Sequence, residues 1–115
     1  MNKIYDLEER TLLFAKNIRK YLRSIYNDEL YKEDCKQLLR SSGSIGANYI
    51  EANESLGKKD FIMRLRISKK EAKETIFWLN ALGLKDSTLD MLIKEATELM
   101  NILGAIIIKC QSKGF

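Results

Sequence analysis

The sequence contains no proline and no histidine, and each absence excludes a class of structure or chemistry. A chain of 115 residues with average composition would carry about five prolines, so their absence favours long uninterrupted helices. Without histidine, the chain lacks the commonest general base and the commonest metal ligand. Only carboxylates, lysines and cysteines remain for chemistry, so we expect no catalytic residues, no metal, no cofactor and no enzymatic activity.

Cysteine is scarce, and long apolar runs are absent. Cys35 and Cys110 each stand alone in a helical pattern, so we expect two partly buried, reduced thiols. The opening residues MNKIYDLEER do not resemble a signal peptide, and no apolar run approaches the roughly 18 residues of a membrane span. These features predict a cytoplasmic protein with no membrane partner.

Apolar residues recur at helical spacing along four stretches of the chain. Hydrophobic residues make up 45% of the sequence and charged residues 31%, which is typical of one soluble domain spanning residues 1–115. The helical stretches run from Tyr5 to about Ile25, from NDEL to Leu56, from Phe61 to Leu82, and from Leu89 onward. No stretch alternates with the period of two expected of a strand.

Capping and breaking residues separate these stretches. Either Asn27 or Asp28 can cap the second helix, SLGKKDF precedes the third, and Gly83 is placed to end it before a cap at Asp86 or Ser87. Four amphipathic helices joined by short breaks bury their apolar faces most simply against one another. The sequence therefore predicts an all-α fold, an antiparallel up-down-up-down four-helix bundle.

The stretch SSGSIGANYIEANES, residues 41–55, has the composition of a loop but the spacing of a helix. The apolar pattern continues through it without losing phase, at Leu38, Ser42, Ile45, Tyr49, Ala52 and Leu56. Each glycine inside a helix costs about 1 kcal/mol relative to alanine, so Gly43 and Gly46 require a reason. We expect them to form, with Ala47, a helix-packing groove that Trp78, Phe77 or Tyr49 of a neighbouring segment fills.

A phosphate-binding loop is a poorer interpretation of the same glycines. Such a loop needs a lysine and then a hydroxyl directly after its last glycine, at a junction from strand to helix. Here Gly46 is followed by ANY, and no strand is predicted before it. A flexible linker is also disfavoured, because the apolar phase is kept on both sides.

The segments QLLRSSGSIGANYIEANES and DFIMRLRISKKEAKETIFWL resemble the two signature blocks of the bacterial proteins known from 23S ribosomal RNA intervening sequences. The matching positions are Gln37, Leu38, Arg40, Ser44, Ile45, Asn48, Glu51, Phe61, Glu71, Ala72 and Glu74. The family usually has glycine directly after the asparagine-x-x-glutamate block, whereas Ala52 stands here. We therefore expect the following turn to be displaced toward Gly57.

The resemblance implies a four-helix bundle that assembles as a homopentamer. In one branch of the family, the accessory proteins of diversity-generating retroelements, a basic pentamer surface contacts nucleic acid and the reverse transcriptase. The expected partners are therefore other copies of this chain, RNA or DNA, and a nucleic-acid enzyme. The resemblance implies no enzymatic activity or catalytic residue.

Positive charge is concentrated in two stretches. Residues 57–75 carry seven lysines and arginines against three acids. The candidate nucleic-acid-binding residues are Lys59, Arg66, Lys69, Lys70 and Lys73 in the third helix and Lys16, Arg19, Lys20 and Arg23 in the first. Such stripes can follow phosphates and make binding steeply dependent on salt, and with no aromatic interleaving we expect little sequence preference. The alternative is a solvated face whose lysines pair locally with Glu71, Glu74 and Asp60.

Two further sets of residues complete the candidate sites. The pairs Glu51/Glu54 and Glu71/Glu74 suggest a di-iron centre, but such centres use glutamate-x-x-histidine on two helices, so we expect ion pairing with Arg40, Lys69 or Lys73. A second apolar set lies off the main stripe of the third helix and is the candidate oligomer contact: Met63, Ile67, Phe77 and Trp78. The alternative for this set is a wide core stripe.

The sequence as a whole predicts a non-enzymatic, oligomeric helical bundle, a pentamer by resemblance, that binds nucleic acid with little sequence preference or serves as an accessory adaptor. The alternative is a scaffold for protein contacts with no role in nucleic-acid binding, whose lysines only keep it soluble.

Overall fold

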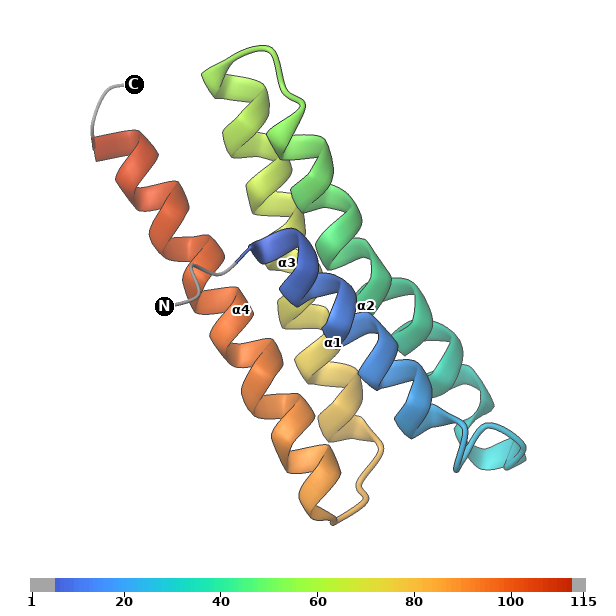
Figure 1. The fold of residues 1–115 in the computed structure, drawn as a ribbon. Helices are drawn as coiled ribbons and strands as arrows, with labels where there is room; N and C mark the ends of the chain where they lie inside the picture. Colours follow the sequence, from blue (N-terminus) through green and yellow to red (C-terminus); the bar gives the residue numbers. More distant parts are fainter. Residues whose placement is uncertain (1–5, 113–115) are drawn as a thin grey trace.

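The computed structural model describes residues 6–112, and within them the chain forms four α-helices and no strand (Figure 1). The elements are α1 (Leu7–Leu22), a short 3-10 helix η1 (Glu29–Tyr31), α2 (Lys32–Asn53), α3 (Lys58–Ala81) and α4 (Ser87–Ser112). Consecutive helices run in opposite directions and pack side by side (Figure 1). The predicted antiparallel four-helix bundle is therefore confirmed.

The predicted breaks fall where the chain turns, although the cap chemistry differs in detail. Asp28, rather than Asn27, accepts a hydrogen bond from the backbone N–H of Leu30 at 2.9 Å, but it starts η1, and α2 follows directly. Asp86 accepts one from the N–H of Leu89 at 2.7 Å and so caps α4. Gly83 has φ of +69°, a left-handed conformation that favours glycine at the end of a helix.

The expected carboxyl ends of the first two helices are wrong. The first helix ends at Leu22 rather than near Ile25, and its expected start at Tyr5 lies outside the described residues. The second ends at Asn53, so Leu56 lies in the connection to α3 and is fully exposed instead of continuing the apolar stripe. As expected, the turn after this block reaches Gly57, which directly precedes α3.

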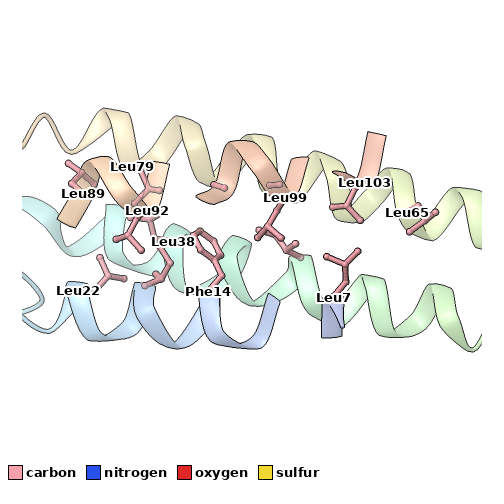
Figure 2. Close-up of a cluster of buried hydrophobic side chains, with 14 of the residues drawn as sticks. Leu7, Phe14, Leu22, Leu38, Leu65, Leu79, Leu89, Leu92, Leu99 and Leu103 are labelled. Carbon is pink, nitrogen blue, oxygen red and sulfur yellow. The ribbon is translucent and has the colours of Figure 1, made fainter. Parts of the chain in front are cut away.

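The core is one apolar interior to which all four helices contribute (Figure 2). Leu22, Leu79, Leu89 and Leu92 gather toward one end of it, and Leu7, Leu65 and Leu103 toward the other (Figure 2). In α1 the apolar Leu12 is exposed, whereas the polar Thr11 before it is buried. Because the Thr11 hydroxyl donates to the carbonyl of Leu7 at 2.7 Å, its burial leaves no polar group unsatisfied.

Two glycines of α2 lie against side chains of α1. A Cβ atom added at Gly46 would lie 2.7 Å from Oγ1 of Thr11, and one at Gly43 would lie 3.6 Å from the guanidinium of Arg19. A close approach was therefore correctly predicted, but α1 supplies it through Thr11 and not through an aromatic side chain. Ala47 is exposed on the outer side of α2, so its placement in the groove is wrong.

The helices form a ring in which α1 and α3 are diagonal. Contacts join α1 to α2, α2 to α3, α3 to α4, and α4 to α1. The fourth edge is incomplete because α1 has 16 residues and α4 has 26, which is about 24 Å against about 39 Å of helix. Among the described helices, none has the length and apolar character needed to cross a membrane.

Candidate nucleic-acid interface

The helix α3 has an inner face that is buried and an outer face that is exposed. Its inner face packs in the core through small and apolar side chains: Leu65, Ser68, Ala72, Thr75 and Leu79. The residues opposite follow intervals of four, three, four, three and four, and all are exposed: Lys59, Met63, Arg66, Lys70, Lys73 and Phe77. We call these six residues the outer stripe.

The cations of α3 make no ion pair with any residue among 6–112. This holds for Arg66, Lys70 and Lys73 of the outer stripe, and for Lys69 beside it. The acids expected to neutralise them, Glu71 and Glu74, instead bind Arg40 of α2. The local pairing considered for the lysines of α3 is therefore wrong for these two acids, and the positive charge of the outer stripe is not cancelled by them.

The contact between Arg40 and α3 has a clear geometry. Nη1 of Arg40 donates to Oε2 of Glu71 at 3.3 Å and lies 3.2 Å from Oε1, while Nη2 bonds Glu74. The hydrogen bond that Arg40 donates to Glu71 is the main reason that the pKa of Arg40 is raised above its ordinary value. The expected pairing of these glutamates with Arg40 is thus confirmed, and within residues 6–112 no three potential metal-binding side chains come together.

Lys69 lies beside the outer stripe, and its side chain extends toward α4. The end of its side chain approaches Gly104, where an added Cβ would lie 3.5 Å from Cε of Lys69. The apolar stem therefore lies across the glycine, a common arrangement for lysine. Of the candidate cations in α3, Lys59, Arg66, Lys70 and Lys73 share one line, and Lys69 adds charge at the border with α4.

The basic residues of α1 do not join this surface within one chain. Lys16, Arg19, Lys20 and Arg23 are all exposed, but α1 is diagonal to α3. Arg19 lies over Gly43 of α2, and Lys20 lines the space between α1 and α4. The two predicted basic stripes are consequently separate surfaces on opposite sides of the bundle.

The candidate oligomer-contact set also divides between two faces. Met63 and Phe77 belong to the outer stripe, with exposed fractions of 46% and 61%. Ile67 and Trp78 are partly buried on the side of α3 that carries Glu74 and faces α2. The rings of Phe77 and Trp78 meet edge to face, with centroids 5.2 Å apart and planes at 83°. Phe77 therefore stands one helical turn beyond Lys73, an aromatic neighbour that the expectation of no aromatic interleaving missed.

A groove between α1 and α4 was not predicted from the sequence. It has a volume of about 1230 Å³, and its lining includes Phe14 and Leu92 of the core and the exposed Leu13 and Met91. In the sequence, Leu13 and Met91 directly precede Phe14 and Leu92, which are buried. An apolar residue beside the buried stripe of each helix was the sequence signal that could have indicated the groove. The incomplete α1/α4 edge leaves these apolar side chains in contact with solvent.

Ion pairs and hydrogen bonds cross the groove. Nε of Arg10 donates to Glu95 at 2.7 Å and Nη2 donates to Glu98 at 2.8 Å, and the hydrogen bond to Glu95 is the main reason that the pKa of Arg10 is raised. Tyr21 donates to Asp86 at 2.8 Å. Burial, reinforced by this bond, raises the pKa of Tyr21 to about 12. These contacts connect α1 to α4 where apolar packing between them is sparse.

Fold and surface together define a helical-bundle protein whose α3 carries a basic outer face that no acid among residues 6–112 neutralises. The family model described as 23S rRNA-intervening sequence protein matches residues 5–105, and the chain belongs to that family. The solved structures include a similar protein, one of unknown function from the S23 ribosomal protein family of Bacteroides thetaiotaomicron. It is 34% identical, with a TM-score of 0.80, and the match covers 87% of this chain and 96% of that one. A search of the curated proteins found no match.

Proposed function

We propose that this protein is a non-enzymatic, self-assembling helical bundle that binds the phosphates of nucleic acid through the outer stripe of α3. One observation carries the proposal: Arg66, Lys70 and Lys73 stand in line on an exposed face, while the acids nearest to them are bound by Arg40 of the neighbouring helix. The positive charge of this face is therefore available to an anionic ligand.

Electrostatics supports the same assignment. Cations that bind phosphates displace condensed counterions, so the logarithm of the binding constant falls with the logarithm of salt by roughly 0.7 per contact on a single strand. With Arg66, Lys69, Lys70 and Lys73 engaged, we expect a slope of roughly −3. Because contacts to phosphates carry no sequence information, this component of binding is insensitive to sequence.

Self-assembly would strengthen this binding. The exposed apolar side chains Leu13 and Met91 of the α1/α4 groove support contact with another copy of the chain. A closed ring, expected to be a pentamer from the family resemblance, repeats the outer stripe around one particle and allows a long strand to bind several copies at once. A protein that handles nucleic acid could dock on the same assembly, which is the accessory role expected from the resemblance.

The test is the affinity for short RNA and DNA fragments between about 50 mM and about 200 mM salt. One variant replaces Arg66, Lys69, Lys70 and Lys73 with glutamine. Its matched control replaces Lys16, Arg19, Lys20 and Arg23 of α1, which changes the net charge by the same amount on the opposite side of the bundle. We expect the α3 variant to lose binding and the α1 variant to retain most of it, with helicity unchanged in both.

Equal losses in the two variants would mean that only net charge matters, and would refute a site on α3. The second candidate function is a protein scaffold, which the α1/α4 groove favours because apolar side chains line it. Absence of nucleic-acid binding by the wild-type protein at about 50 mM salt would favour the scaffold.

A further inference from the structure

The outer stripe places an exposed aromatic ring at the end of a row of cations. From Lys59 to Phe77 it covers 19 residues of uninterrupted helix, whose 18 steps give a rise of ~27 Å. Lys70, Lys73 and Phe77 are the last three members and lie one turn apart on the same face. A ligand that follows the cations toward the carboxyl end of α3 therefore reaches the ring of Phe77.

Trp78 holds this ring in position. Trp78 is partly buried and packs against the core, and its ring meets that of Phe77 edge to face at 5.2 Å. A ring restrained in this way loses little conformational freedom when a flat ligand stacks on it. With 61% of its surface exposed, Phe77 remains available for stacking.

Cations beside an aromatic ring favour a single strand over a duplex. In a duplex the bases stack on one another and offer phosphates to a helix face, but no free base surface for Phe77. In a single strand an unpaired base can stack on the ring while the neighbouring phosphates contact the cations. We propose that the outer stripe binds single-stranded nucleic acid, with Arg66, Lys70 and Lys73 at phosphates and Phe77 beneath an unpaired base.

This inference rests on the proposed function and adds the class of nucleic acid to it. The competing occupant is a protein partner that Phe77 and Met63 would anchor. In that case the stripe would show no preference for unpaired over paired nucleic acid. The charge of the stripe favours the nucleic acid, because its four cations, Lys59 included, make no ion pair within residues 6–112.

The experiment measures the affinity for an unstructured RNA strand of ~12 nucleotides, for the same DNA strand, and for each paired with its complement. Phe77→Leu removes the ring but keeps an apolar side chain. Tyr26→Leu is the matched control, because Tyr26 is also exposed, at 55%, but lies outside α3. The double variant Lys70→Gln/Lys73→Gln tests the phosphate contacts alone.

We expect Phe77→Leu to weaken single-strand binding by about 5-fold to 150-fold and to leave duplex binding unchanged. Tyr26→Leu should change neither, and the double lysine variant should weaken both. Dependence on Phe77 for the RNA strand, the DNA strand or both supports the inference, and a preference for RNA would indicate contact with its 2′-hydroxyl groups. Trp78 is the only tryptophan of the chain, so single strands, unlike duplexes, should also change its fluorescence in the wild-type protein.

Unchanged single-strand affinity in Phe77→Leu, with weaker binding in the lysine variant, would overturn the inference and leave the proposed function standing. If the protein binds none of these nucleic acids, both the inference and the proposed function are overturned. If Phe77→Leu does not fold, the fluorescence of wild-type Trp78 decides instead: an equal response to strand and duplex would overturn the inference.

Discussion

At Gly46 one added methyl group would alter the packing of α1 on α2. Its Cβ would lie 2.7 Å from Oγ1 and 3.1 Å from Cβ of Thr11, a buried side chain whose hydroxyl is fixed by its hydrogen bond to Leu7. Gly43 differs, because its added Cβ would meet only the end of the exposed Arg19 side chain at 3.6 Å. The two glycines, one turn apart, should therefore respond oppositely to the same substitution.

We expect Gly46→Ala to lower the free energy of unfolding by about 1 kcal/mol, because overpacking costs about 1–3 kcal/mol and alanine regains about 1 kcal/mol of helix propensity. Gly43→Ala should raise that free energy by up to about 1 kcal/mol. Urea denaturation of both variants measures the difference. Adding Thr11→Ala to Gly46→Ala removes the 2.7 Å contact with Oγ1 and should relieve part of the overlap, so the pair should be non-additive. A Gly46→Ala protein more stable than the wild type would contradict this account of the contact.

The sequence predicted that something approaches these glycines but not which residue does so. A missing side chain indicates that space is filled by a neighbour, while the identity of that neighbour depends on how α1 is rotated about its axis. The polar Thr11 was missed for a physical reason: a hydroxyl that bonds a carbonyl in the preceding turn can be buried at little cost.

At the scale of elements, polar contacts align α2 with α3. The Ser68 hydroxyl donates to the carbonyl of Ile45 at 2.7 Å, and the Thr75 hydroxyl donates to Ser41 at 2.8 Å, all in buried positions. Arg40 closes this interface at its surface by binding Glu71 and Glu74. These directional bonds restrict how far one helix can slide along the other, which apolar packing alone restricts less.

Arg40→Gln should lower the free energy of unfolding by about 1–3 kcal/mol, because it leaves the nearly buried carboxylate of Glu71 without its charged partner. The buried Oε1 of Glu71 accepts no hydrogen bond from the described residues, so nothing described there replaces the guanidinium. Chemical denaturation at neutral pH measures the loss, and adding Glu71→Gln should restore part of it.

The matched control is Lys32→Gln, since Lys32 and Glu29 form an exposed ion pair at 3.5 Å. Such pairs contribute little, so its stability should stay within about 0.5 kcal/mol of the wild type. Equal effects of Lys32→Gln and Arg40→Gln would show that the burial of Glu71 has no energetic consequence.

The number and order of the helices were predictable from the sequence, but the groove at the incomplete α1/α4 edge was not. The period of the apolar residues and the break clusters predicted four helices and their order, because both are local properties of the chain. The α1/α4 groove depends on the separation of two helices far apart in sequence, which no local pattern encodes. The same limit applied to the cations of α3: their spacing predicted the outer stripe, but only the folded chain shows Arg40 of α2 bound to the acids beside them.

The groove and the outer stripe lie on different edges of the bundle, so the proposed assembly and the proposed nucleic-acid binding can be tested separately. Replacing Leu13 and Met91 with lysine puts charge on the exposed apolar side chains of the groove, with exposed fractions of 57% and 69%, so folding should persist. We expect this variant to be monomeric by native mass spectrometry, whereas Lys70→Gln/Lys73→Gln should keep the wild-type mass. Retention of the wild-type mass by the groove variant would move the assembly surface elsewhere.

The groove variant should also separate the binding of short strands from the binding of long strands. A monomer presents one outer stripe, so the groove variant should bind a short strand at least as tightly per chain as the wild type, because its two new cations add positive charge. A long strand gains avidity only from a particle with several stripes, and its affinity for the monomer should fall on the order of 100-fold. Equal losses for short and long strands would mean that the groove itself contacts the nucleic acid, contrary to a binding site on α3.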